Sequence, residues 1–201
     1  MRMYTLLNKD EVKSNRMKVF CINGISLAGK DSFCRHVNSR YNNLHNKYNR
    51  ANIQVISSID PVKEIYAKFF GWDGTKTPVH RKNLNILKNI WVQVNDGPSR
   101  WLENELAKAS DTRCSYLFVM VREFSEMLKM QHVSRSLGYQ AFTLNIVREG
   151  IPIPPIEQEF LDSHPHDYRY DIIVNNPTVD SYPDVPKLDE SAYIFCNFFG
   201  E

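Results

Sequence analysis

KVFCINGISLAGKDSF, residues 18–33, is the stretch that decides the fold. It joins a short apolar, β-branched and aromatic run to a glycine-bounded loop, and such a run is typical of a buried strand. Gly24 and Gly29 are followed directly by Lys30, which is the spacing of a phosphate-binding loop between a strand and a helix. The backbone N–H groups of such a loop, the helix N-terminus and the lysine ammonium all favour phosphate oxygens. The pattern therefore predicts a site for a nucleoside triphosphate, and the alternative is an ordinary glycine turn with a surface lysine.

The predicted triphosphate contacts are the loop and the first helical turn after it. They are Gly24, Ile25, Ser26, Leu27, Ala28, Gly29, Lys30, Asp31 and Ser32. The residue after the lysine is usually a Ser or Thr whose hydroxyl binds Mg²⁺. Asp31 occupies that position here and Ser32 follows, so both are candidate magnesium ligands. In the alternative interpretation, Asp31 only stabilises the positive N-terminus of the helix.

Strand patterns alternate with helix patterns along the rest of the chain. Strands are expected at 18–23, 53–57, 115–121, 142–147 and 170–174. Helices are expected at 30–41, 60–70, 81–95, 99–110 and 124–137, with Asp60 as an N-cap before Pro61. This alternation predicts an α/β fold, a parallel sheet with helices on both faces that binds ligands at the carboxyl ends of its strands.

Composition excludes several classes of protein. Lys and Arg number 25 against 23 Asp and Glu, a net charge of +2, which is far from the strongly basic balance of a nucleic-acid binder. The four cysteines form no CxxC pair, so we interpret them as reduced thiols of a cytoplasmic protein. No apolar run has the length of about 18 residues that a membrane span needs, which predicts a soluble protein. We expect residues 1–201 to form one domain, and the oligomeric state is left open.

A lysine followed by Asp and a hydroxyl residue resembles the loop of the phage-type deoxynucleoside monophosphate kinases and related nucleoside monophosphate kinase-like proteins. Later segments are similar to landmarks of that group in the same order. They are Asp60-Pro61-Val62-Lys63-Glu64-Ile65, Phe70-Gly71-Trp72, Asn95-Asp96-Gly97-Pro98, Val121-Arg122-Glu123 with Glu126, and Asp171 with Asn175. The resemblance covers most of residues 18–180. It implies a P-loop NTPase fold like that of adenylate kinase, with ATP as phosphoryl donor, Mg²⁺ as cofactor and a closing lid.

Phosphoryl transfer depends on in-line positioning and on positive charge around the transferred group. We therefore expect Lys30 to stabilise that group and Arg122 and Arg148 to clamp it. Arg122 follows the most apolar strand, and its alternative is a salt bridge to Glu123 or Glu126. Arg148 opens a proline-rich segment, 148–169, which we expect to be a mobile lid; its alternative is a solvated loop residue.

The helical stretch from about residue 60 to 110 is where an acceptor-binding region is expected. Its candidate acceptor contacts are Asp60, Lys63, Arg81 and Arg100. Asp60 is alternatively only a helix cap, and the two arginines are alternatively solvated. Small-molecule nucleotides are thus the predicted partners, without nucleic acid or membrane.

The leading hypothesis is a kinase that phosphorylates a nucleoside or deoxynucleoside monophosphate. Two alternatives stay open. Asp31 and Met120, which stands where some relatives carry an acid, favour a nucleotide-binding regulatory module with little or no turnover. The loop itself does not specify the acceptor, so a kinase of a non-nucleotide metabolite is the other.

Overall fold

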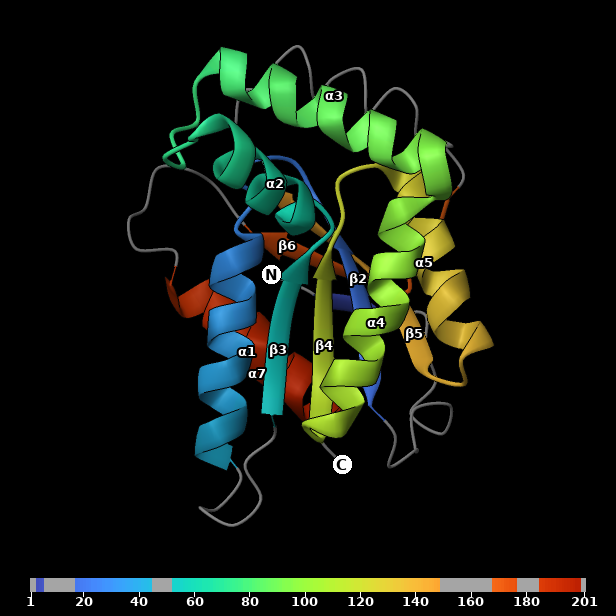
Figure 1. Cartoon of the computed structure of the whole chain (residues 1–201). Coiled ribbons are helices and arrows are strands. Elements are labelled where there is room, and N and C mark those ends of the chain that lie inside the picture. Colours follow the sequence, from blue (N-terminus) through green and yellow to red (C-terminus); the bar gives the residue numbers. More distant parts are fainter. Residues whose placement is uncertain (1–2, 6–16, 45–51, 149–167, 177–184, 200–201) are drawn as a thin grey trace.

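The structure is a computed structural model, and it describes residues 3–5, 17–44, 52–148, 168–176 and 185–199 (Figure 1). Its strands are β1 (Met3–Thr5), β2 (Lys18–Asn23), β3 (Asn52–Ser57), β4 (Cys114–Met120), β5 (Gln140–Arg148) and β6 (Ile172–Asn176). Its helices are α1 (Lys30–Leu44), α2 (Asp60–Phe70), α3 (Pro78–Asn95), α4 (Gly97–Asp111), α5 (Phe124–Ser136) and α7 (Val185–Phe199). Among these residues no helix is long and apolar enough to cross a membrane.

The sheet has the strand order β1-β6-β5-β2-β4-β3. All five predicted strands are present and run parallel to one another. The edge strand β1 is a correction, because it pairs antiparallel with β6 and was not predicted. Three residues are too few to show a period in the sequence, and only the neighbouring edge of the sheet makes them a strand.

The order of the strands creates a crevice. The chain leaves β2 through α1 and reaches β3, passing over the place that β4 later fills, whereas β4 is followed by α5 and by β5 on the other side of β2. The connections after β2 and β4 therefore depart in opposite directions. In an open parallel sheet, ligands bind at such a switch point, outside the carboxyl ends of the strands.

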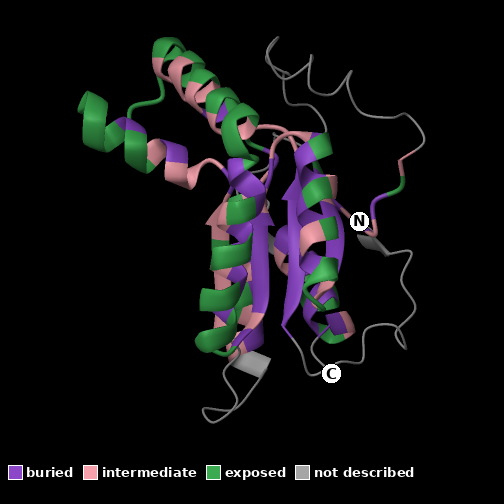
Figure 2. Cartoon of the chain, turned by 45° about the vertical axis from the view of Figure 1, so that its right-hand side comes forward, coloured by how far each residue is buried: buried purple, intermediate pink, exposed green. Residues whose placement is uncertain are grey.

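Strand β2 is buried on both faces and divides the core in two. Phe20 and Ile22 belong to the half beneath α1 and α7, whereas Val19 and Cys21 belong to the half beneath α4 and α5. All four are fully buried, as the purple centre of Figure 2 shows. This alternation is the period of a strand covered by helices on both sides.

Helix α7 covers one half of this core and was not predicted. Phe20 packs against both Phe195 and Phe199, with ring centroids 4.9 Å apart in each case. Burying each such ring contributes about 1.5–3 kcal/mol. The last helix is therefore part of the layer that supports the phosphate loop.

Helices α2 and α3 form an arm that projects from the carboxyl edge of the sheet (Figure 2). Gly71, in the left-handed conformation with φ 64°, ends α2 as its sequence predicts. The predicted cap of α2 is wrong: Ile59 is the N-cap, and the Asp60 carboxylate accepts a hydrogen bond from the Ser57 backbone N–H at 3.0 Å. The sequence also placed the start of α3 three residues late, because Thr77 caps that helix by accepting from the His80 N–H at 3.2 Å.

The arm continues into the body through a tight joint. Asp96, with φ 49°, separates α3 from α4, which begins at Gly97 rather than at the predicted residue 99. A Cβ on Gly97 would lie 2.0 Å from the Trp91 ring nitrogen. The indole thus packs directly on this backbone and fixes the angle at which the arm leaves the body.

Candidate nucleotide-binding site

The loop from Gly24 to Gly29 has a backbone that only these residues allow. Gly24 has φ 139°, and a Cβ there would lie 2.6 Å from the Ile146 carbonyl oxygen on β5. Gly29 has φ 100°, and its Cβ would lie 2.7 Å from the Asn176 amide nitrogen. Both values lie where side chains other than glycine are strained. The two glycines of the motif are therefore required by the chain itself.

Two asparagines, at the ends of β2 and β6, hold the loop. The Asn23 amide donates to the Arg122 carbonyl at 3.1 Å, while its oxygen accepts from the Gly24 N–H. Asn176, which is 1% exposed at the end of β6, donates to the Ala28 carbonyl at 2.9 Å. Sequence reasoning assigned neither residue a role. The only signal in the sequence was their position: Asn23 ends one predicted strand, and Asn176 follows another.

Lys30 begins α1 and its ammonium lies over the loop. Its Nζ donates to the Gly24 carbonyl and, at 2.9 Å, to the Ile25 carbonyl. Both acceptors lie within the loop that the sequence predicts to surround phosphates. An ammonium with three donor hydrogens can exchange these carbonyls for phosphate oxygens.

A cavity of about 320 Å³ lies beside the loop at the carboxyl ends of β2, β3 and β4. Its wall comes from the phosphate loop, from the starts of α2 and α5, and from the arm. The lining residues are Asn23, Gly24, Ile25, Ser26, Lys30, Ser57, Ser58, Ile59, Lys76, Asn85, Lys88, Met120, Val121, Arg122 and Glu123. Two of the predicted catalytic residues, Lys30 and Arg122, are thus brought into one wall.

The arm supplies three pocket residues that the sequence did not single out. Lys76 lies between α2 and α3, and Asn85 and Lys88 lie on α3. Asn85 and Lys88 lie three residues apart, so they share the face of α3 that lines the cavity. Sequence patterns gave no signal for them, because polar residues on a helix look alike whether they face solvent or a site.

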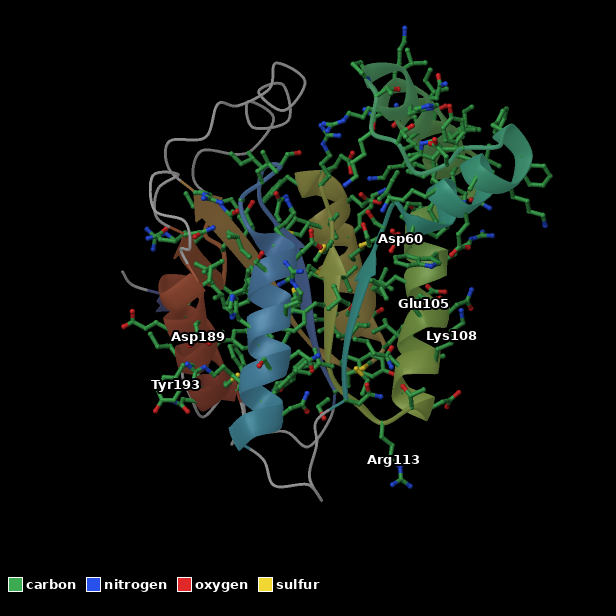
Figure 3. All side chains as sticks on the ribbon, turned by 90° about the vertical axis from the view of Figure 1, so that its left-hand side faces the viewer. Asp60, Glu105, Lys108, Arg113, Asp189 and Tyr193 are labelled. Carbon is green, nitrogen blue, oxygen red and sulfur yellow. The ribbon has the colours of Figure 1, made fainter. Side chains whose placement is uncertain are left out.

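The predicted acceptor contacts lie outside this cavity wall. Asp60 and Lys63 pair with each other at 2.7 Å, at the foot of the arm (Figure 3). Arg81 on α3 and Arg100 on α4 are exposed, and neither lines the cavity. Arg113, at the opposite end of the sheet in Figure 3, marks the side away from the site.

The two candidate magnesium ligands lie at the start of α1, next to Lys30. Asp31 is exposed, and the Ser32 hydroxyl accepts from Arg35 at 3.1 Å. Across the described residues no three His, Cys, Asp or Glu side chains gather as a metal site. Proteins usually hold Mg²⁺ through one or two side chains together with substrate phosphates and water, so Asp31 and Ser32 stay candidate ligands.

Arg148 is the last residue of β5 and approaches the loop from outside. Its Nη1 donates to the Leu27 carbonyl at 3.4 Å. Leu27 itself has φ 65° and is 78% exposed at the tip of the loop. The remainder of the predicted lid, residues 149–167, lies outside the described residues. Arg148 therefore contacts the phosphate loop, and its role as a clamp stays a prediction.

A buried charge cluster closes the far wall of the cavity. The Lys88 ammonium pairs with Glu123 and, at 2.6 Å, with Glu126. Burial raises the pKa of Glu126 to about 7. Burial also disfavours a charged Glu123, but a hydrogen bond from Glu126 and the charge of Lys88 outweigh it and lower the pKa of Glu123. Glu126 therefore keeps its proton below a pH of about 7 and loses it above, whereas Glu123 is the ionised member of the pair.

The strand order, the glycine loop between β2 and α1, and Lys30 over that loop together define a P-loop NTPase fold. No family model matches the chain, and no curated protein matches it.

Among solved structures, the chain is similar to the APS kinase CysC of Mycobacterium tuberculosis in complex with AMPPNP and APS, at 13% identity over 92% of this chain and 99% of that one, with a TM-score of 0.48. It is also similar to a sugar kinase from Janibacter sp., at 11% identity over 91% and 96% of the two chains, with a TM-score of 0.45. A de novo designed protein with the P-loop NTPase fold gives 10% identity over 92% and 95%, with a TM-score of 0.40. Each TM-score is below 0.5, so these similarities carry no argument. The fold assignment rests on the strand order and the phosphate loop of this chain.

Proposed function

We propose that this protein transfers the γ-phosphoryl group of ATP to a nucleoside or deoxynucleoside monophosphate. One observation carries the proposal: the phosphate-loop lysine lines the same cavity as cations from the arm and from the end of β4, Lys76 and Arg122. Cations from three different elements around one cavity suit two phosphate-bearing substrates that meet there. In this proposal Lys30 serves the donor, Lys76 serves the acceptor, and Arg122 offsets the charge of the transferred phosphoryl group.

The chemistry requires little else from the protein. A monophosphate oxygen is already ionised near neutral pH, so it can attack without a general base. Catalysis then consists of holding the two phosphates in line and of offsetting their charge. Lys30 and Arg122 both line the cavity, and we propose that they supply the donors for this charge. Met120, at the position where an acid could help to hold Mg²⁺, is compatible with this division of roles because Asp31 and Ser32 are available.

The acceptor side also offers groups that can recognise a base or a sugar. Asn85 carries both a donor and an acceptor on one amide, and the Glu123 carboxylate accepts from hydroxyl or amino groups. The cavity volume of about 320 Å³ is that of a small-molecule site. These features support a nucleotide acceptor more than a small inorganic one.

Mg²⁺ bound at this site would offset charge on the β- and γ-phosphates. Asp31 and Ser32 are the residues that would hold it, directly or through water. The four cysteines are free and buried, which supports the proposed cytoplasmic setting.

A coupled assay with ATP, Mg²⁺ and a panel of ribo- and deoxynucleoside monophosphates tests the proposal. The panel includes phosphorylated metabolites without a base, and Lys30→Met serves as the inactive control. Transfer to at least one nucleotide, lost in the control, is the expected result. Tight ATP binding without transfer to any acceptor would instead assign the regulatory module, and transfer only to a metabolite without a base would assign the other alternative.

A further inference from the structure

Lys88 joins the arm to the body of the molecule. It lies on α3, is only 5% exposed, and its ammonium contacts two carboxylates of the body, Glu123 before α5 and Glu126 in its first turn. Ser58, at the turn that leads into the arm, donates to the same Glu126 oxygen at 3.4 Å. We call these four residues the arm latch.

The arm latch contains two carboxyl groups and only one ammonium group. Two carboxylates share one ammonium, and among the described residues no group hydrogen-bonds the other Glu126 oxygen, Oε1, which is buried. A buried carboxylate with one oxygen left without a hydrogen bond is costly to keep ionised, so burial favours a proton on Glu126. Glu126 is 9% exposed and Glu123 lines the cavity, so this proton lies just behind the acceptor wall.

We propose that the arm latch docks the arm for acceptor binding, with Lys88 as the positioning residue that places Asn85 and Lys76 against the cavity. The proposal rests on the proposed function, since it assigns the arm to the acceptor. Lys88 follows Asn85 by three residues on α3, so the ion pair fixes the rotation of α3 and its distance from α5. Without Lys88, the buried Glu126 and the partly buried Glu123 lose their partner, and an arm that moves away is favoured because water then reaches both carboxylates.

Breaking the arm latch should change the KM for the acceptor and not the KM for ATP. The ATP side of the cavity is built by the phosphate loop and by strand ends that contain no arm residue. Loss of the latch should therefore raise the acceptor KM by about tenfold or more, since two contacts made only by the docked arm are lost. The KM for ATP should change less than twofold.

The proton on Glu126 gives the latch a dependence on pH. The charged and polar groups that face Glu126 are Lys88 from α3, Glu123 at the start of α5 and Ser58 from the turn before α2. Above a pH of about 7 Glu126 ionises and adds a negative charge behind a wall that binds an anionic acceptor. The acceptor KM should thus rise by about fivefold to tenfold between pH 6.5 and pH 8, because one further, partly screened negative charge repels the anionic acceptor.

Three variants test the arm latch on the whole chain. Lys88→Met removes the ion pair, Lys82→Met removes an exposed lysine from the same helix as a matched control, and Glu126→Gln keeps the shape but not the titration. The expected result is a raised acceptor KM for Lys88→Met alone, with a smaller pH dependence in Glu126→Gln than in the wild type. An unchanged acceptor KM in Lys88→Met, or a wild-type pH dependence in Glu126→Gln, would overturn the proposal.

Hydrogen exchange separates this inference from the proposed function. The amides of α3 should exchange faster in Lys88→Met than in Lys82→Met without any nucleotide present, because the docked arm is lost. If wild type transfers no phosphoryl group but α3 shows this difference, the function is wrong and the latch stands. If wild type is an active kinase and α3 exchanges equally in both variants, the latch is wrong and the function stands.

Discussion

Gly24→Ala should be one of the most damaging single substitutions in the chain. The backbone at Gly24 has φ 139°, a region that essentially only glycine adopts and that costs about 1–3 kcal/mol for alanine. The added Cβ would also lie 2.6 Å from the Ile146 carbonyl oxygen. That oxygen belongs to a central strand that cannot move, and such overpacking costs about 1–3 kcal/mol more. We therefore expect a loss of about 2–6 kcal/mol in the free energy of unfolding.

Urea unfolding of three alanine variants measures this effect and its origin. Gly71→Ala is the matched control, because Gly71 has φ 64° with nothing within 4 Å of a Cβ, so only about 1–2 kcal/mol of strain is expected. Gly29→Ala should fall between the two, because its Cβ would meet the movable Asn176 side chain. Calorimetric titration with ATP should show lost binding for Gly24→Ala and wild-type binding for Gly71→Ala. Equal stabilities of Gly24→Ala and Gly71→Ala would refute the loop geometry on which the site rests.

Four further variants test individual side chains of the site. Lys30→Ala should abolish measurable transfer while its circular dichroism stays that of the wild type, since the ammonium donates to loop carbonyls and the side chain is not part of the buried core; retained turnover would mean that the loop is not the donor site. Ser32→Ala and Asp31→Ala should differ in the Mg²⁺ concentration that gives half-maximal rate, because only a true ligand should raise it, and equal small effects would exclude both. Arg148→Ala should raise the KM for ATP by about threefold to tenfold, the loss of one exposed charged contact, and an unchanged KM would leave it a structural partner of Leu27.

The sequence predicted the fold well where one residue pattern has one structural meaning. A run such as Lys18–Asn23, followed by Gly24 and Gly29 at fixed spacing, leaves little choice but a strand, a phosphate loop and a helix. The glycines are informative because the backbone there excludes other residues, which the values of φ at both positions confirm. Strand β1 and helix α7 escaped prediction because their formation depends on surfaces made by distant parts of the chain.

The acceptor half of the site was harder to predict for a physical reason. Asp60 and Lys63 were chosen because they open a helix after a strand, but they lie one turn apart and satisfy each other. Lys76, Asn85 and Lys88 face the cavity because Trp91 packs on the backbone at the joint and sets the direction of α3. That contact joins the end of one helix to the start of the next, and no periodicity in the sequence encodes the resulting angle.

The phosphate loop and the arm are held in different ways, and this difference determines which half of the site responds to pH. The phosphate loop lies close against its neighbours, since a Cβ on Gly24 would lie 2.6 Å from the Ile146 carbonyl oxygen and the Asn176 amide donates to the Ala28 carbonyl. The arm is held largely by side chains, including a buried ammonium that two carboxylates share. Breaking such a pair is costly when one partner is removed, yet a single proton can change its balance. Triphosphate binding should therefore be insensitive to pH near neutrality, whereas the fit of the acceptor follows the protonation of Glu126.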